Sequence, residues 1–190
     1  MPDATVVTLV AVASFLEYAA LAFVVRARSL RARGPSVRTR QGLAASRLPY
    51  FVWLPYVVLA ARPGPELEVT EPLAWLGLAL VVGGTTFASW SAITLGRHFD
   101  MEVEVHRGHE VVRTGPYAIV RHPVYAGLAV HFLGMCLASG NLVLVAGVLG
   151  AAIPAFVLRA REEESLLREE LGDAYDRYAR EVPMLVPFVR

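Results

Sequence analysis

The sequence predicts an all-α integral membrane protein with about five transmembrane helices and a small cytoplasmic cap. Three observations support this fold class. Hydrophobic residues make up 55% of the 190 residues. Charged residues make up only 18%, against roughly 25% in a typical soluble domain. The apolar residues also gather in long segments, and about 20 of them span the hydrocarbon core of a bilayer as a helix.

The expected spans are residues 4–25, 44–61, 73–95, 124–139 and 142–158. The first and third are long enough to cross a bilayer, and Glu17 is the only charged residue within them. We do not expect the first span to be a cleaved signal peptide, because its leader MPDAT has no positive charge. Only Gly140 and Asn141 separate the last two spans, which predicts a tight helical hairpin.

Charge placement predicts the orientation of the chain. Seven arginines lie within residues 26–47, before and at the start of the second span, whereas the next loop carries Glu66, Glu68 and Glu71. Positive loops stay in the cytoplasm, so we expect the N-terminus outside and residues 96–123 and 159–190 inside. The net charge of only +1 argues against nucleic-acid binding. The arginine cluster is instead typical of a topology signal or a contact with anionic lipids.

Residue usage excludes several chemistries. All 18 basic residues are arginine, so no lysine can form a Schiff base. Cys136 is the only cysteine, which rules out a disulfide within the chain. Four histidines lie in residues 96–125, but their spacing fits no HExxH pattern, so we expect no metal. No Gly/Pro/Ser-rich linker or internal repeat appears, so residues 1–190 are expected to form one domain.

Most of the reactive side chains fall in two predicted cytoplasmic segments, 96–125 and 159–190. Within the first, VEVHRGHEVV (103–112) predicts a short irregular hairpin, and Pro123 is placed to begin a helix. The second should continue the last span as an amphipathic helix, in which Arg159 and Glu163 share a face. A solvated ion pair beside interfacial tyrosines would be the ordinary explanation of these residues.

Two motifs carry a resemblance to a known family. The run GHEVVRTGPYAIVRHPVYAG, a short helical hairpin and then RAREEESLLREELGDAYDRY resemble the isoprenylcysteine carboxyl methyltransferase family and the related phospholipid N-methyltransferases. The resemblance covers about residues 90–183. Val111 and Leu171 depart from the family pattern, and both are packing positions.

The resemblance implies an S-adenosylmethionine site roofed by the cytoplasmic cap, with two groups of residues. Three residues would face the transferred methyl and the acceptor, namely Arg121, Arg159 and Glu163. Seven would contact the cofactor, namely His109, Val112, Gly115, Tyr117, His122, Tyr125 and Glu164.

The acceptor is expected to be lipidic, and an isoprenylcysteine-type carboxylate fits the family best. A carboxylate needs no general base, and the guanidinium of Arg159 or Arg121 could aim it. An amine or hydroxyl acceptor would instead need Glu163 or His122 as the base.

Three alternatives remain open at this point. They are phospholipid N-methylation, an NADPH-dependent reductase of the sterol-reductase type, and a non-catalytic lipid-binding scaffold. The sequence does not reveal the oligomeric state. Four glycines in the spans could permit either close helix packing, which we favour, or a lateral cleft. They are Gly83, Gly84, Gly127 and Gly134. Glu17 and His131 are polar residues within spans, and we leave both outside the site.

Overall fold

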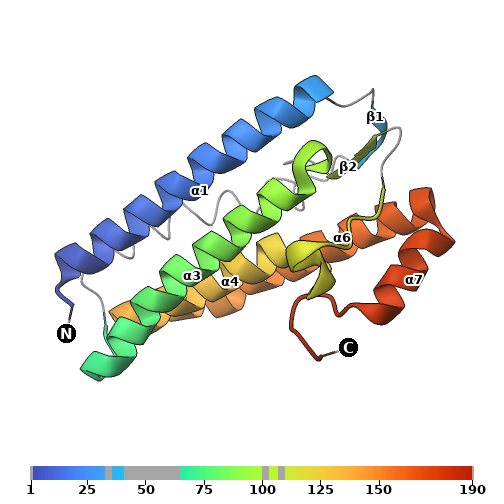
Figure 1. The fold of residues 1–190 in the computed structure, drawn as a ribbon. Helices are drawn as coiled ribbons and strands as arrows, with labels where there is room; N and C mark the ends of the chain where they lie inside the picture. Colours follow the sequence, from blue (N-terminus) through green and yellow to red (C-terminus); the bar gives the residue numbers. More distant parts are fainter. Residues whose placement is uncertain (1, 33–35, 41–64, 100–102, 107–109, 190) are drawn as a thin grey trace.

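The computed structural model describes residues 2–32, 36–40, 65–99, 103–106 and 110–189 (Figure 1). The helices are α1 (Ala4–Ala32), α3 (Glu71–Leu95), α4 (Pro123–Ser139), α5 (Leu142–Gly147), α6 (Ile153–Leu171) and α7 (Asp173–Glu181). Short turns are η1 (Gly96–His98), η2 (Gly115–Ala118) and the π-helical η3 (Val148–Ala152).

Four of the five expected spans are helices, which confirms the helical membrane fold. Within the described part of the chain, Ala4–Arg31, Glu71–His98 and Leu142–Leu171 are long and apolar enough to cross a membrane. Helix α4 is apolar but shorter. The expected span 44–61 lies outside the described residues.

Helices α3 and α4 form the tightest contact of the bundle, and glycines make it possible. A Cβ atom added to Gly84 would lie 2.5 Å from the Gly127 carbonyl oxygen, and one added to Gly77 would lie 2.6 Å from the Gly134 carbonyl oxygen. The two pairs run in opposite directions along the chain, so the helices are antiparallel. The interpretation of close packing is therefore confirmed for Gly84, Gly127 and Gly134. It fails for Gly83, where an added Cβ would meet nothing within 4 Å.

The predicted hairpin between the last two spans is present and has a cap on each side. Gly140 ends α4 in the left-handed conformation, with φ +63°, which glycine adopts without steric cost. Asn141 begins α5, and its side-chain oxygen accepts hydrogen bonds from the backbone N–H groups of Val143 and Leu144. The residues between the spans therefore fix both helix ends as well as the turn.

Helix α6 continues the last span out of its apolar part, as predicted. The stretch Leu142–Leu171 is continuous through η3, and its charged part begins at Arg159, after the apolar run ends. The apolar spacing predicted that the same helix continues to Tyr178, but α6 ends at Leu171. Gly172 has φ +51°, and the chain reverses there into α7. The helical periodicity continues through Gly172 and so conceals this break.

The hairpin predicted within residues 103–112 is wrong. Strand β2 (Val103–His106) pairs antiparallel with strand β1 (Ser36–Arg40), which follows α1. Residues 110–112 are not in a strand. The physical reason is that η1 lies against the end of α1, where the Ser29 hydroxyl donates to the Arg97 carbonyl at 2.7 Å. This contact brings the two chain segments together.

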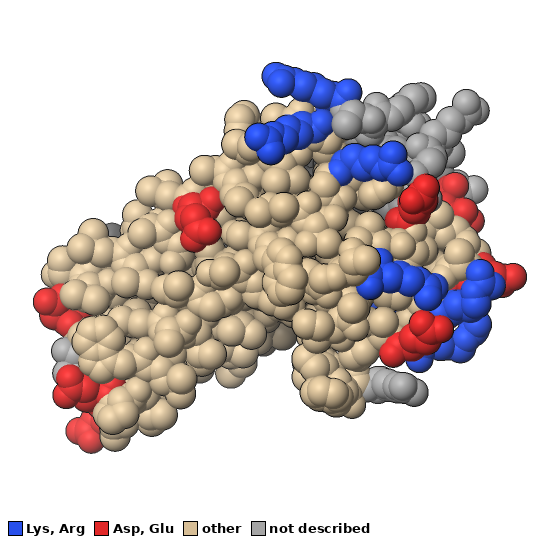
Figure 2. All heavy atoms as spheres, viewed as in Figure 1, with Lys and Arg blue, Asp and Glu red and all other residues tan. Residues whose placement is uncertain are grey.

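The charged side chains of the visible face gather at the two ends of the elongated bundle, with one acidic group over α1 between them (Figure 2). Glu17 is exposed on this helix. Most of the visible blue arginine side chains lie at the end that carries η1, the charged part of α6 and α7, and acidic groups mark the other end. The largely uncharged surface between the two ends is what a bilayer would cover.

Candidate active site

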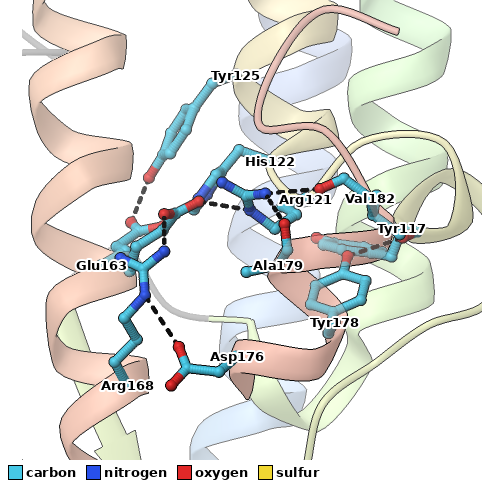
Figure 3. Close-up of polar contacts among 11 residues, drawn as sticks. Tyr117, Arg121, His122, Tyr125, Glu163, Arg168, Asp176, Tyr178, Ala179 and Val182 are labelled. Atoms are coloured by element: carbon cyan, nitrogen blue, oxygen red, sulfur yellow. Dashed lines mark hydrogen bonds and ion pairs between the residues drawn. The ribbon is translucent and has the colours of Figure 1, made fainter. Parts of the chain in front are cut away.

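The two motif segments meet where α4 begins beside α6, and His122 lies between them (Figure 3). Its Nε2 atom is 3.3 Å from Glu164 Oε1, and its Nδ1 atom is 3.5 Å from Glu163 Oε2. His122 is buried at 6% exposure. It directly precedes α4 with φ −121° and ψ 64°, so its backbone is not extended as expected, whereas Pro123 occupies the first turn of that helix as predicted. An imidazole held between two carboxylates is favoured in its protonated form.

Arg121 points to α6, to the last turn of α7 and to the residue after it. Its Nε atom donates to Glu164 Oε1 at 2.6 Å. Its Nη1 atom donates to the carbonyl oxygens of Ala179 and Val182, at 2.8 and 2.6 Å. The side chain is 11% exposed. This guanidinium therefore joins the two motifs to the C-terminal part of the chain, and its expected role toward the acceptor stays a prediction.

Arg159, Glu163 and Tyr125 form the second half of the network. The Arg159 Nε atom donates to the Tyr125 hydroxyl at 2.7 Å and to Glu163 Oε1 at 3.2 Å. The Tyr125 hydroxyl donates to the same Glu163 oxygen. Arg159 is 2% exposed and Glu163 is 24% exposed. Glu163 is thus the more accessible of the two, although both were expected near the acceptor.

The charges of the network support one another. Burial alone would lower the pKa of His122, but its hydrogen bonds to the two carboxylates and their negative charges raise this pKa above the usual 6.5. Burial would raise the pKa of Glu164, yet hydrogen bonds with His122 and Arg121 lower it to about 2. The pKa of Glu163 is also lowered, because His122 and Arg159 outweigh its burial. Both carboxylates are therefore ionised at neutral pH.

Helix α7 covers this network through residues that the sequence analysis did not single out. Arg168 binds Glu164 Oε2 at 3.0 Å and Asp176 at 3.3 Å. The Tyr178 hydroxyl donates to the Tyr117 carbonyl at 2.7 Å. Arg113 lies over the Tyr178 ring, 5.4 Å from its centroid. The four-residue spacing of Glu164 and Arg168 was a readable signal for one of these contacts.

The remaining expected cofactor residues have different positions. Tyr117 is buried in η2, and burial is the main cause that raises its pKa well above 10, with the charge of Glu163 adding to it. Gly115 begins η2 with φ +57° beside Trp90 and Thr94 of α3. Val112 is half-buried in the irregular segment before η2. His109 lies outside the described residues.

Aromatic rings continue from the site into the bundle. The rings of His122 and Tyr125 stack with centroids 5.9 Å apart, and those of Tyr125 and Phe156 with centroids 5.8 Å apart. Deeper in the bundle, His131 Nδ1 lies 2.8 Å from the Thr85 hydroxyl, so His131 joins α4 to α3. Within the described ranges, no group of three or more His, Cys, Asp or Glu side chains is placed to hold a metal ion.

Comparisons with known proteins point to one family. The model of the isoprenylcysteine carboxyl methyltransferase (ICMT) family matches residues 75–169. Protein-S-isoprenylcysteine O-methyltransferase B of Arabidopsis thaliana is 31% identical over 127 residues, and the match covers 66% of this chain and 64% of that protein. The human protein-S-isoprenylcysteine O-methyltransferase is 30% identical over 128 residues, covering 66% and 45%.

A solved structure is similar in fold. The eukaryotic intramembrane Ras methyltransferase ICMT matches with a TM-score of 0.58 and 24% identity, over 77% of this chain and 50% of that one. Each match covers less than two thirds of the relative's length. The family-model match, residues 75–169, contains the first motif, the hairpin and the first half of the second motif.

Proposed function

Because the chain belongs to the isoprenylcysteine carboxyl methyltransferase family, we propose that it is a membrane methyltransferase dependent on S-adenosylmethionine. Its acceptor is a lipid-linked carboxylate, in the first place that of an isoprenylated cysteine, the group in the names of its relatives. The methylated atom is then oxygen. The arginine-rich end of the bundle, which holds the site, faces the cytoplasm.

One observation carries this proposal, namely the contact of the two motifs at His122. Residues 42 positions apart in the chain, His122 and Glu164, share a buried network with Arg121. A surface ion pair at a membrane exit would not need a histidine at 6% exposure. Ionisable groups with shifted pKa values that collect at one end of an apolar bundle are typical of a functional site.

The residues present fit the methyl donor. S-adenosylmethionine supplies an electrophilic methyl on a sulfonium cation, and it also carries an amino acid and an adenosine. Glu163 offers a carboxylate that is 24% exposed, and its Oε2 atom lies 3.5 Å from His122 Nδ1. Cationic groups of the donor would be held here. Tyr125 stacks on both His122 and Phe156, so its contribution is its hydroxyl rather than an open ring face.

The acceptor carboxylate arrives already ionised, so no side chain has to remove a proton from it. What the protein supplies is position, a counter-charge and exclusion of water. Arg159 is held by Tyr125 and Glu163 at the membrane end of the network, where a guanidinium can bind a carboxylate with two parallel hydrogen bonds. Phe156 and the apolar part of α6 lead from this point into the bundle.

Calorimetry on the full chain in detergent tests the donor. We expect S-adenosylmethionine to bind and NADPH not to bind. The substitution Glu163→Gln should weaken binding about tenfold to a hundredfold, since a charge-assisted contact of about 1.5–3 kcal/mol is lost. Glu169→Gln is the matched control, because this exposed glutamate lies on the same helix. Failure of well-folded protein to bind S-adenosylmethionine would refute the proposal, and binding of NADPH would favour a reductase.

Transfer of a labelled methyl group tests the acceptor. We expect label on an S-farnesylated cysteine with a free carboxylate, and none on its methyl ester or on phosphatidylethanolamine. Label on phosphatidylethanolamine alone would mean that the protein is a methyltransferase but that it methylates nitrogen instead of oxygen. Binding of the donor with no acceptor labelled would point to the lipid-binding scaffold.

A further inference from the structure

The segment that follows α7, Val182–Val189, lies as a strap along the start of α4. The backbone N–H of Arg121 donates to the Pro183 carbonyl at 2.8 Å, and that of His122 donates to the Met184 carbonyl at 3.0 Å. The Arg121 side chain adds its bonds to the carbonyls of Ala179 and Val182. The strap is therefore fixed to the two residues on which the site is built.

The order of these bonds gives the direction of the strap. Residue numbers rise together on the two sides, from Arg121 with Pro183 to His122 with Met184, so the strap runs parallel to the chain that it contacts. The next residue of that chain, Pro123, begins α4 and enters the apolar bundle. The start of the strap therefore heads toward the bilayer, and Figure 1 shows the segment returning from α7 along the bundle before its last residues bend outward, away from the helices.

The far end of the strap exposes only apolar side chains. Val186 is 56% exposed, Phe188 is 100% exposed and Val189 is 61% exposed. A hydrogen bond from the Val189 N–H to the Val186 carbonyl closes a turn here, in which Phe188 has φ +67°. No charged residue occurs from Val182 to Val189. Complete exposure of a phenylalanine side chain to water is unfavourable.

We propose that the turn Val186–Val189 inserts into the cytoplasmic leaflet of the bilayer, beside the first turn of α4. Lipid is the occupant because the strap runs in the direction in which α4 enters the membrane. Insertion would cover the three exposed side chains and couple the membrane surface to Arg121 and His122 through the strap. This proposal does not depend on methyl transfer, because it concerns only where the turn lies.

Spin labelling tests the position of the turn, and the single cysteine simplifies the design. In a Cys136→Ala background, one label is attached at Phe188→Cys and the full chain is reconstituted into vesicles of phosphatidylcholine and phosphatidylglycerol. Leu149→Cys is the lipid control, because Leu149 is 56% exposed within the last span. Asp173→Cys, exposed at the start of α7, is the aqueous control. Collision with oxygen is compared with collision with a water-soluble nickel chelate.

We expect the ratio of oxygen to nickel accessibility at position 188 to be severalfold above that at 173 and close to that at 149. A ratio equal to that at 173 would place the turn in water and overturn the proposal. Protection from both reagents would mean that protein covers the turn, which also overturns it. With the label at Val186→Cys instead, Phe188→Asp should lower the ratio severalfold, and an unchanged ratio would contradict insertion.

Discussion

Alanine at Gly84 should destabilise the protein by separating α3 from α4. The added Cβ would lie 2.5 Å from both the Gly127 carbonyl oxygen and the His131 nitrogen, and these are backbone atoms that cannot rotate away. Ordinary contact begins at 3.4 Å, so the helices must move apart by about 0.9 Å at this point. Overpacking of a tight interface costs about 1–3 kcal/mol.

Gly83 provides a matched control on the same helix. An added Cβ there meets nothing within 4 Å, so Gly83→Ala should show only the gain in helix propensity, which is about 0.5–1 kcal/mol in water. Both variants receive this gain. The difference between them therefore isolates the steric term, and we expect Gly84→Ala to be less stable than Gly83→Ala by about 1–3 kcal/mol.

Thermal unfolding in detergent measures this difference. For a chain of this size, 1 kcal/mol corresponds to roughly 2–4 °C in Tm, so the two variants should separate by several degrees. The double variant Gly84→Ala/Gly127→Ala should cost less than the sum of the two single variants, because one displacement of the helices relieves both clashes. Equal Tm values for Gly83→Ala and Gly84→Ala would refute the close contact of α3 with α4.

Three further predictions concern the site. Raising the pH should lower Tm, because the pKa of His122 is raised in the folded protein. Its ion pairs are complete below about pH 6.5 and are lost as the pH rises through the folded pKa. His122→Gln should flatten this decline in a pH series of Tm, and an unchanged slope would contradict the role of His122. Lowering the pH from 4.5 toward 2 should also lower Tm, because protonation of Glu164 over that window removes the stability of its pairs with His122 and Arg121. Glu164→Gln should remove this acid limb and cost about 3–5 kcal/mol at neutral pH in chemical unfolding. Arg159→Lys should reduce kcat far more than donor affinity, since lysine cannot replace the guanidinium fork; equal losses in steady-state kinetics and calorimetry would show that Arg159 does not aim the acceptor.

The spans and the hairpin could be predicted from the sequence because each depends on local properties. The length of an apolar run determines whether a helix can cross a bilayer, and Gly140 followed by Asn141 carries its own capping chemistry. The pairing of His122 with Glu163 and Glu164 was expected only through the family resemblance. Spacing alone could not bring together residues that lie about 40 positions apart.

Other features depend on contacts that no local pattern reveals. Strand β2 pairs with β1 about 65 residues away because η1 lies against α1. The cover provided by α7 depends on the left-handed conformation of Gly172, while the apolar periodicity runs through it unchanged. Gly83 and Gly84 are neighbours in the sequence, and only the packing of α4 shows which of them must be small.

The wide turn η3 sets the rotational phase of everything that follows it. A π-helical turn holds about one residue more than an α-helical turn, and one residue corresponds to about 100° of rotation. Val148–Ala152 therefore rotates Ile153–Leu171 relative to α5, and with it the face that carries Arg159, Glu163 and Glu164. The angular placement of these charges is thus decided about ten residues earlier, inside the apolar part of the helix. Loss of one residue there would turn the whole charged face away from His122 without changing any residue of the site.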